Sequence, residues 1–326
     1  MMKNPVLESL SDVIRHSQFV KTHRKKIAEH ASYMAYEELP IWLWRVPYLP
    51  DEDSVRTVDF LLLINSINFA FTDFQTHSVF STEYAGAIWS DAEAMAACVK
   101  RALEDGIPIL DGKYLAEANR KDLEKIFQGN IEMPMLDERV KIFNEVRQVL
   151  RKKYQGHFHN FIEDCSPKLY DQGRGIIDRL TSELPSFNDV SPFKGQTVKF
   201  YKRAQLAAYM LFGRLRTTGL FKLEDPDQFT AFADYIIPVA LRLMGMTSYT
   251  RELEEKIKAR QVIPRHSPEE VEIRAHCLYA ISLLTKEINK RRKPGNQIIA
   301  PQVDSRLWTH FHKTDWPYHL TITTAY

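Results

Sequence analysis

Residues 232–238 read FADYIIP, and the apolar run continues through Val239, Ala240 and Leu241. Asp234 is the one carboxylate in a stretch that otherwise suits burial. A buried, ionised carboxylate is costly, so it either shifts its pKa or finds hydrogen-bond donors. An Asp just before an apolar run is also a preferred helix N-cap, and Pro238 would fall in the first turn. The two interpretations are compatible, because a carboxylate at a helix start beside aromatic rings is often a working group.

Helical spacing of apolar residues extends outward from this stretch in both directions. The predicted helices cover residues 5–14, 21–38, 55–71, 91–105, 120–127, 136–155, 173–184, 197–216, 236–244, 249–260, 267–292 and 302–311. Strand signals are few: a short hairpin within residues 77–89 and a terminal strand over residues 319–326. The stretches 185–195 and 293–301 are typical of connections within one fold. The sequence predicts one mainly α domain over residues 1–326.

Composition excludes several classes of protein. The chain has 326 residues, 44% of them hydrophobic, and a formal net charge of +2, which argues against a protein that coats nucleic acid. Its three cysteines, Cys98, Cys165 and Cys277, form no C-x-x-C pair and indicate reduced thiols. The first ten residues lack a signal-peptide core, and residues 58–71 are too short and polar to span a bilayer. We therefore expect a cytoplasmic protein without a membrane partner.

Three further segments combine polar and apolar residues in ways that allow two interpretations. INFAFTDF, residues 67–74, places aromatic rings at the end of an apolar helix, where they either stack a nucleobase or form core. FYKRAQ, residues 200–205, puts Lys202 and Arg203 into an apolar helix, either to meet a phosphate or carboxylate or as a surface pair. In EEVEIRA, residues 269–275, Glu270 and Arg274 have the spacing of a surface ion pair.

The sequence contains few motifs that are typical of metal-dependent or nucleotide-binding enzymes. Two triplets of sequence His-Phe-His occupy residues 157–159 and 310–312. On a strand such a triplet can chelate, but both lie in predicted helical or turn contexts, where residues i and i+2 diverge. No H-E-x-x-H, G-x-S-x-G, P-loop or G-x-G-x-x-G motif is present. We expect neither a metal site nor an α/β-hydrolase, P-loop or Rossmann fold.

Taken in order, several segments resemble the queuosine salvage family of queuosine 5′-phosphate N-glycosylases. They are INFAF (67–71), ALEDGIPILD (102–111), MPMLDERVKIFNEVRQVLRKKY (133–154), ELPSF (183–187), FYKRAQ (200–205), FADYIIP (232–238), VEIRA (271–275) and an ending with His319, Thr321, Thr323 and Tyr326. The resemblance implies a mostly helical fold distantly like that of DNA glycosylases. It implies hydrolysis of the N-glycosidic bond of queuosine 5′-monophosphate, which releases queuine for reinsertion into tRNA, with no metal or organic cofactor and no stable nucleic-acid complex.

The same resemblance assigns roles to residues of this chain. The family's catalytic aspartate carries over to Asp234, where a carboxylate would stabilise the oxocarbenium character of the breaking ribosyl bond. Phe69 and Phe71 would stack the base, Asp73 would face its cationic amine, and Lys202 would bind the phosphate or the ribose. The remaining substrate-binding residues expected are Asn68, Tyr235, Glu272, Arg274, His319, Thr321, Thr323 and Tyr326.

This chain departs from the family pattern at four positions. Thr72 replaces the usual Trp after Asn-Phe-x-Phe, and Met210 lies where the helix after FYKRAQ usually carries an acid. Leu320 and Ile322 replace tail arginines. These changes leave open an alternative function: a non-catalytic or re-specialised binder of modified nucleotides on the same scaffold.

Overall fold

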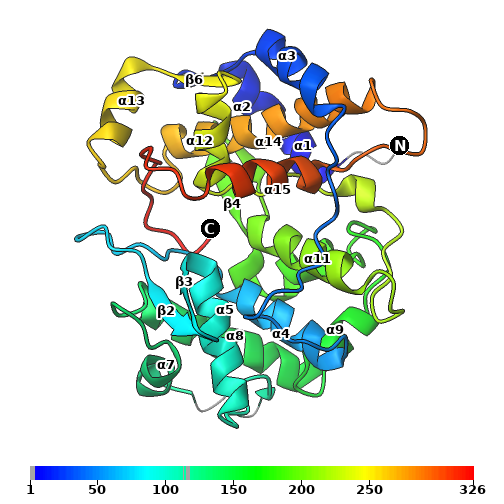
Figure 1. Ribbon diagram of the computed structural model, residues 1–326, viewed down its shortest axis with the longest axis vertical. Coiled ribbons are helices and arrows are strands. Elements are labelled where there is room, and N and C mark those ends of the chain that lie inside the picture. The colour runs from blue at the N-terminus through cyan, green and yellow to red at the C-terminus, as the bar shows by residue number, and fades with distance from the viewer. Residues whose placement is uncertain (1–3, 113, 115–117) are drawn as a thin grey trace. The chain divides into compact units, whose positions relative to one another are not determined.

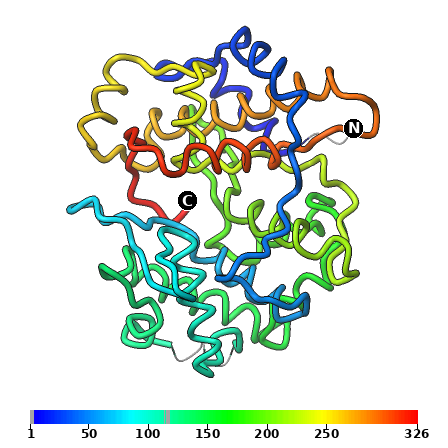
Figure 2. The backbone as a smooth tube through the Cα atoms, viewed as in Figure 1, coloured from blue at the N-terminus to red at the C-terminus, as the bar shows by residue number. Residues whose placement is uncertain are grey.

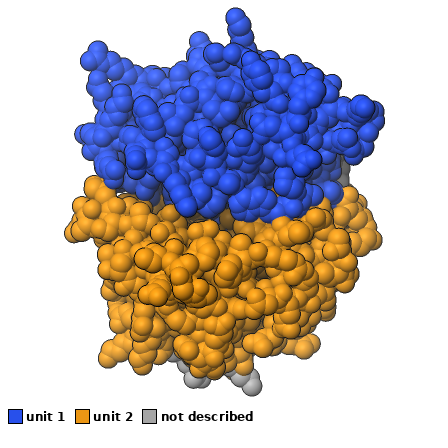
Figure 3. Space-filling view, viewed as in Figure 1, with its two compact units in different colours: residues 1–42, 189–205, 225–322 blue, residues 43–188, 206–224, 323–326 orange. Residues whose placement is uncertain are grey.

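The computed structural model describes residues 4–326 apart from 113 and 115–117. The chain divides into two compact units (Figure 3). The first contains residues 1–42, 189–205 and 225–322, and the second contains residues 43–188, 206–224 and 323–326. Because each unit is built from separated segments, neither is a contiguous sequence domain, and the single-domain organisation stays a prediction.

The first unit is organised around one long buried helix. Its elements are α1 (Pro5–Ser9), α2 (Ser11–His16), β1 (Val20–Thr22), α3 (Arg24–Met34), β4 (Val190–Phe193), β5 (Gln196–Lys199), η2 (Pro226–Gln228), α12 (Ile236–Leu243), β6 (Thr247–Tyr249), α13 (Arg251–Lys258), α14 (Pro268–Asn289) and α15 (Ala300–Phe311). Helices α2, α3, α12 and α15 pack on α14, so segments from both ends of the sequence lie side by side (Figures 1 and 2).

The second unit is also mainly helical. Its elements are α4 (Val55–Ser66), β2 (Ser81–Tyr84), β3 (Ala87–Ser90), α5 (Asp91–Glu104), α7 (Arg120–Ile126), α8 (Leu136–Lys153), α9 (Phe158–Glu163), α10 (Ile176–Glu183) and η1 (Pro185–Phe187). Helix α4 is buried along most of its length and packs on α5, α8 and α9. Helix α11 (Lys202–Leu215) begins in a segment of the first unit and ends in one of the second.

Several helices begin with a side-chain cap. The Asn4 side chain accepts hydrogen bonds from the backbone N–H groups of residues 6 and 7, with Pro5 as the first helical residue. Asn119 caps α7 in the same way. Ser267 caps α14, which opens on Pro268. These caps satisfy N–H groups that lack a partner inside the helix, and they confirm the predicted helical starts at these positions.

The strands are the least well predicted elements. The hairpin of β2 and β3 confirms the one expected within residues 77–89. The predicted terminal strand is wrong: among residues 319–326 only Leu320 makes an isolated bridge, to Val262. Residues 190–199 form the hairpin of β4 and β5, where we predicted a connection and then the start of a helix. Its turn is made by Lys194 and Gly195, both with positive φ. The sequence feature that indicates this hairpin is therefore the glycine at a turn position, and not an alternation of polar and apolar residues.

A third pairing, β1 with β6, was also not predicted, because residues 21 and 22 were assigned to a helix. The mainly α fold class is nevertheless confirmed. None of the helices in the described part of the chain combines the length and the apolar character that crossing a bilayer requires.

Candidate active site

Asp234 lies directly before α12 and caps it. Its Oδ1 accepts hydrogen bonds from the backbone N–H of Ile236 at 2.9 Å and of Ile237 at 3.1 Å. Only 9% of the residue is exposed. The Asp234 side chain is therefore both a helix cap and a buried carboxylate, so the two interpretations of the sequence are compatible. Among the described residues, the hydrogen bonds to this side chain engage Oδ1, which leaves Oδ2 available to face a bound molecule.

Three buried polar side chains hold the loop that carries Asp234. Gln205, on α11, exchanges hydrogen bonds with Thr230 at 2.6 and 2.9 Å. Asp304, in the first turns of α15, accepts the Phe232 N–H through Oδ2 at 2.8 Å. On α14, Arg274 donates from Nε to the carbonyl oxygen of residue 233 at 3.1 Å. The backbone on the N-terminal side of Asp234 is therefore fixed from three helices, a rigidity that a precise site requires.

Arg274 is itself held by a buried ion-pair network. Its guanidinium makes two hydrogen bonds to Asp189, at 2.9 and 2.6 Å, and lies 3.5 Å from Glu270. It also stacks over the Phe200 ring, 4.0 Å from the centroid. Glu270 and Arg274 are 1% exposed, so the prediction of a surface ion pair is wrong. The i,i+4 spacing was recognised correctly, but α14 is buried on the face that carries these residues.

Lys202 is a buried cation at the start of α11. Its backbone N–H donates to Asp189 at 3.2 Å, and no ion pair within 4.0 Å is found for its ammonium group among the described residues. Burial lowers the pKa of Lys202, and the negative charge of Asp234 opposes that shift. Arg203 is 1% exposed, so the surface-pair interpretation of these two cations is wrong. A buried ammonium without a close carboxylate suits an anionic ligand.

Two carboxyl groups share this environment. Burial raises the pKa of Asp234, and the Lys202 ammonium and the N–H groups of Ile237 and Ile236 partly offset the rise. Burial raises the pKa of Asp304 well above its usual value, and the charge of Asp234 raises it further. Two like charges in a buried site disfavour each other. The Lys202 charge lowers the pKa of both groups, but it is a larger influence on Asp234, which also accepts two N–H groups where Asp304 accepts one, so the ionised form is favoured more at Asp234.

The tail of the chain reaches this site within the first unit. The rings of Tyr235 and Tyr318 lie 4.8 Å apart, centroid to centroid, which brings the residue after Asp234 beside the residue before His319. Burial lowers the pKa of His319 to about 3, and Arg274 and Arg242 add to the effect. His319 is therefore a neutral imidazole at neutral pH. Thr321 is buried, and its hydroxyl donates to the carbonyl oxygen of Ile263 at 3.0 Å.

Glu272 has a well-defined structural partner. Its carboxylate accepts hydrogen bonds from the backbone N–H groups of Gln18, Phe19 and Val20 at 2.7–3.0 Å. These bonds fix the chain before and into β1 on α14. Because both carboxylate oxygens accept backbone N–H groups, the assignment of Glu272 to substrate binding stays a prediction.

The predicted aromatic residues lie in the second unit. Phe69 has no exposed surface, and Phe71 is 4% exposed. The Arg139 guanidinium lies over both rings, 4.3 and 5.4 Å from their centroids, and donates to the carbonyl oxygens of residues 69 and 70. For Phe69 this geometry favours the core interpretation over base stacking. Asn68 is also buried.

Three other predicted residues belong to this unit. Asp73 accepts the backbone N–H groups of Gln75 and Thr76 at 3.0 and 2.6 Å, and these bonds lower its pKa. Thr323 accepts the N–H of Ala325, and the backbone oxygen of Tyr326 accepts the N–H of Ala70. The part that these residues play in substrate binding stays a prediction.

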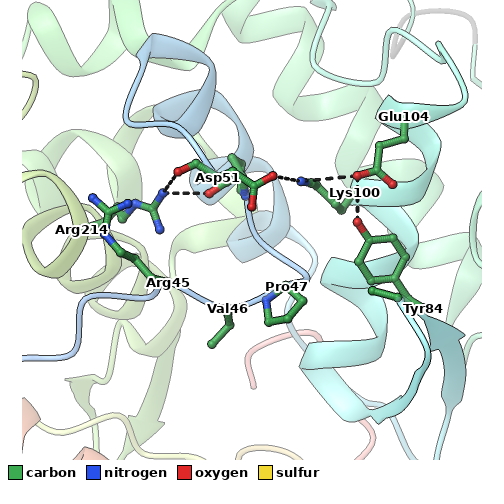
Figure 4. Close-up of a pocket in the computed structure, with 10 residues that line it drawn as sticks. Arg45, Val46, Pro47, Asp51, Tyr84, Lys100, Glu104 and Arg214 are labelled. Carbon is green, nitrogen blue, oxygen red and sulfur yellow. Dashed lines mark hydrogen bonds and ion pairs between the residues drawn. The ribbon is translucent and has the colours of Figure 1, made fainter.

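Two cavities lie outside the Asp234 cluster. One, of about 520 Å³, is in the first unit beside β1 and β6 and is lined by residues such as His276 and Tyr279. The other, of about 560 Å³, is in the second unit (Figure 4). Its charges are largely paired with one another: Lys100 lies 2.9 Å from Asp51 and 3.4 Å from Glu104, which accepts the Tyr84 hydroxyl. This mutual pairing makes it a poor site for an anionic substrate.

Sequence reasoning missed the residues that support Asp234. Asp189 lies in a segment that was predicted to be a connection, and Asp304 lies in the predicted helix 302–311 and was given no role. Gln205 was quoted within FYKRAQ but given no role. One sequence signal was available for Asp304. It lies three residues after Pro301, which is in the first turn of α15, and it shares the apolar face of this helix with Val303 and Leu307. A carboxylate is unusual on such a face.

Comparison with known proteins identifies the family. A family model described as "Queuosine salvage protein" matches residues 48–326. The chain belongs to the queuosine salvage protein family. Among curated relatives, the queuosine 5′-phosphate N-glycosylase/hydrolase of Sphaerobacter thermophilus is 33% identical over 98% of this chain and 97% of its own length. The protein of the same name from Mus musculus is 29% identical over 80% of this chain and 79% of its own.

Membership of the queuosine salvage family agrees with the resemblance carried by the ordered motifs. The relative of the same name from Schizosaccharomyces pombe is 28% identical over 79% of this chain. Three of the motifs that carry the resemblance, FYKRAQ, FADYIIP and VEIRA, supply Lys202, Gln205, Asp234 and Arg274 to the one buried cluster described above.

Proposed function

We propose that this chain hydrolyses the N-glycosidic bond of queuosine 5′-monophosphate and releases queuine for salvage into tRNA. The relatives whose names state this activity cover nearly the whole chain. The observation that carries the proposal is Asp234: a buried carboxylate with one oxygen engaged by helix α12 and the other available, on a loop held by three helices.

The proposed chemistry follows from the charge of that carboxylate. As the C1′–N bond breaks, its electron pair leaves with the base and C1′ gains oxocarbenium character. Asp234 stabilises this positive charge, more strongly in a buried site than in water. A water molecule attacks C1′, and Asp234 accepts the proton that the water loses. The proton taken up by Asp234 then passes, directly or through water, to the departing nitrogen, so the products are neutral queuine and ribose 5-phosphate and Asp234 is ionised again.

Two further residues of the first unit have roles in this proposal. Lys202 binds the 5′-phosphate, because its ammonium is buried and none of the described carboxylates forms an ion pair with it within 4.0 Å. His319 supports the departing base. Queuine is a 7-deazapurine, so no ring N7 can be protonated. With a pKa of about 3, His319 acts as a neutral hydrogen-bond donor to the developing base anion rather than as a cationic acid.

We place this activity on a helical fold distantly like that of DNA glycosylases, in a single functional domain spanning residues 1–326, and in the cytoplasm. The near-neutral net charge of +2 supports a small nucleotide as substrate rather than a stable nucleic-acid complex. No cofactor takes part in the proposed steps.

One observation favours a second candidate, a re-specialised binder of modified nucleotides. Asn65 donates through Nδ2 to the Met210 sulfur at 3.1 Å, while no described residue forms a hydrogen bond with its buried Oδ1. The position of Met210 usually carries an acid in the family. A changed contact of this kind can alter which base is accepted without affecting Asp234.

Base release separates the two candidates. Queuosine 5′-monophosphate, unphosphorylated queuosine and guanosine 5′-monophosphate are incubated with the protein, and the products are resolved by chromatography. We expect queuine from the first substrate, much less from the second, and none after Asp234→Ala in a variant with an unchanged circular dichroism spectrum. Absence of release from all three by the folded wild type would overturn the hydrolase assignment in favour of the binder.

A further inference from the structure

A cluster of two imidazoles and one carboxylate lies in the second unit, outside the Asp234 site. It contains Asp59, on the buried helix α4, and His157 and His159, at the start of α9. Nδ1 of His157 lies 3.2 Å from Oδ2 of Asp59, and Nδ1 of His159 lies 3.1 Å from the same oxygen. Three candidate ligand atoms thus converge within 4.8 Å of one another.

The local backbone explains why this triplet converges. His157 is the N-cap of α9 and has extended dihedral angles, φ −127° and ψ 140°, whereas His159 is already helical. The two rings stack, with centroids 5.0 Å apart and planes 28° apart. The prediction that residues i and i+2 diverge is therefore wrong for this triplet, because it straddles the helix boundary.

We propose that Asp59, His157 and His159 form a binding site for a divalent cation of the zinc class. Neutral imidazole nitrogen and carboxylate oxygen are ligands that Zn²⁺ and Co²⁺ accept. In a tetrahedral site with metal–ligand distances of about 2.1 Å, ligand atoms lie about 3.4 Å apart. The observed separations of 3.1 and 3.2 Å are close to that value and longer than the commonest N–H···O hydrogen bond of about 2.9 Å.

The surroundings of the cluster also suit a metal. Oδ1 of Asp59 accepts the backbone N–H of His159 at 2.8 Å, which orients the carboxylate as outer-shell hydrogen bonds do in metal sites. The Asp59 side chain is 5% exposed, whereas those of His157 and His159 are 39% and 20% exposed. A cation can therefore enter from solvent, with water completing its coordination. It would link α4 to the start of α9 and stabilise the second unit.

The experiment measures metal binding by the full-length chain after treatment with a chelator. Zn²⁺ is titrated in competition with a chromophoric chelator, and Co²⁺ is followed by its visible absorption. We expect one equivalent per chain, at least about 10-fold weaker binding in Asp59→Asn and His159→Ala, and a rise in melting temperature of about 3 °C with Zn²⁺ in the wild type alone. Asp59→Asn keeps an acceptor for the His159 N–H.

The second His-Phe-His triplet provides a matched control. His310 contacts Phe311 edge-on, and His312 stacks on Trp308 at the end of α15. His310→Ala removes an imidazole from an identical local sequence and should leave the affinity unchanged. His157→Ala, at a half-exposed position, serves if Asp59→Asn fails to fold. Lack of Zn²⁺ uptake at millimolar concentration, or uptake unaffected by Asp59→Asn and His157→Ala, would overturn the proposal and leave an ordinary hydrogen-bonded cluster.

Discussion

At the scale of single residues, the proposed chemistry depends on which buried carboxyl group carries the negative charge. Burial raises the pKa of both Asp234 and Asp304. Lys202 and two backbone N–H groups favour charge on Asp234, whereas Asp304 accepts a single N–H. Environments that separate two pKa values in this way divide the roles of neighbouring acids. In the proposed mechanism Asp234 acts on the substrate, while Asp304 holds the loop that carries it by accepting the Phe232 N–H.

Replacing Lys202 tests this division. Its ammonium lowers the pKa of Asp234, so Lys202→Met should raise that pKa. Because the ionised carboxylate is the active form, activity is lost as pH falls through this pKa. The acidic limb of the pH profile of kcat/KM should therefore move to higher pH, and KM for the phosphorylated substrate should rise. Lys222→Met, at an exposed lysine paired with Glu224, is the control. If the acidic limb lay at the same pH in Lys202→Met and in the wild type, Lys202 would not control the pKa of Asp234.

The free energy of unfolding of Asp304→Asn tests whether the pKa of Asp304 is raised in the folded protein. The folded-state pKa of Asp304 is raised above its unfolded value, so folding binds a proton. Stability from this group is present at low pH and declines as pH rises between the two values. Asn retains an acceptor for the Phe232 N–H and has no proton to take up. We expect unfolding at pH 7 to cost about 1 kcal/mol more in this variant by urea titration, with a weaker pH dependence. A less stable variant would contradict this.

At the scale of elements, the long helices were predictable and the short strands were not. Helices α5, α8 and α12 have clear apolar periodicity, and α14 has a recognisable start at Ser267 and Pro268. The hairpin of β4 and β5 contains Pro192 and has few alternating residues, and β1 and β6 have three residues each. Such short pairs form because tertiary packing brings them together, and a single sequence carries little signal of that.

Helix α14 supports the site through Arg274, which makes a clear prediction for stability. Removing one partner of a buried ion pair leaves the other charge uncompensated. Arg274→Gln should therefore lower the free energy of unfolding by about 3 kcal/mol, because Asp189 and Glu270 lose their common cation.

The matched control for Arg274→Gln is the same substitution in an exposed ion pair. Arg251 lies 2.7 Å from Glu255 at i,i+4 spacing, with side chains 93% and 61% exposed. Arg251→Gln should change the free energy of unfolding by less than about 0.5 kcal/mol. Equal effects of the two substitutions in urea titrations would show that the Arg274 network does not support the fold.

At the scale of the whole molecule, three motifs that are far apart in the sequence supply one buried cluster in the first unit. Their order along the chain was enough to indicate the family and to single out Asp234 and Lys202. The residues that fix them in place, Asp189 and Asp304, were not predictable, because their roles depend on which helices pack around α14. Members of the buried cluster were therefore easier to identify from the sequence than the residues that hold them in place.

The most direct test of the account is the rate of queuine release from queuosine 5′-monophosphate by wild type and Asp234→Asn. The substitution keeps the Oδ1 that caps α12 and removes only the charge. We predict a fall in kcat of about 10³-fold with an unchanged circular dichroism spectrum, and a fall of less than about 10-fold for Asp304→Asn. A folded Asp234→Asn protein that keeps wild-type kcat would contradict the central claim.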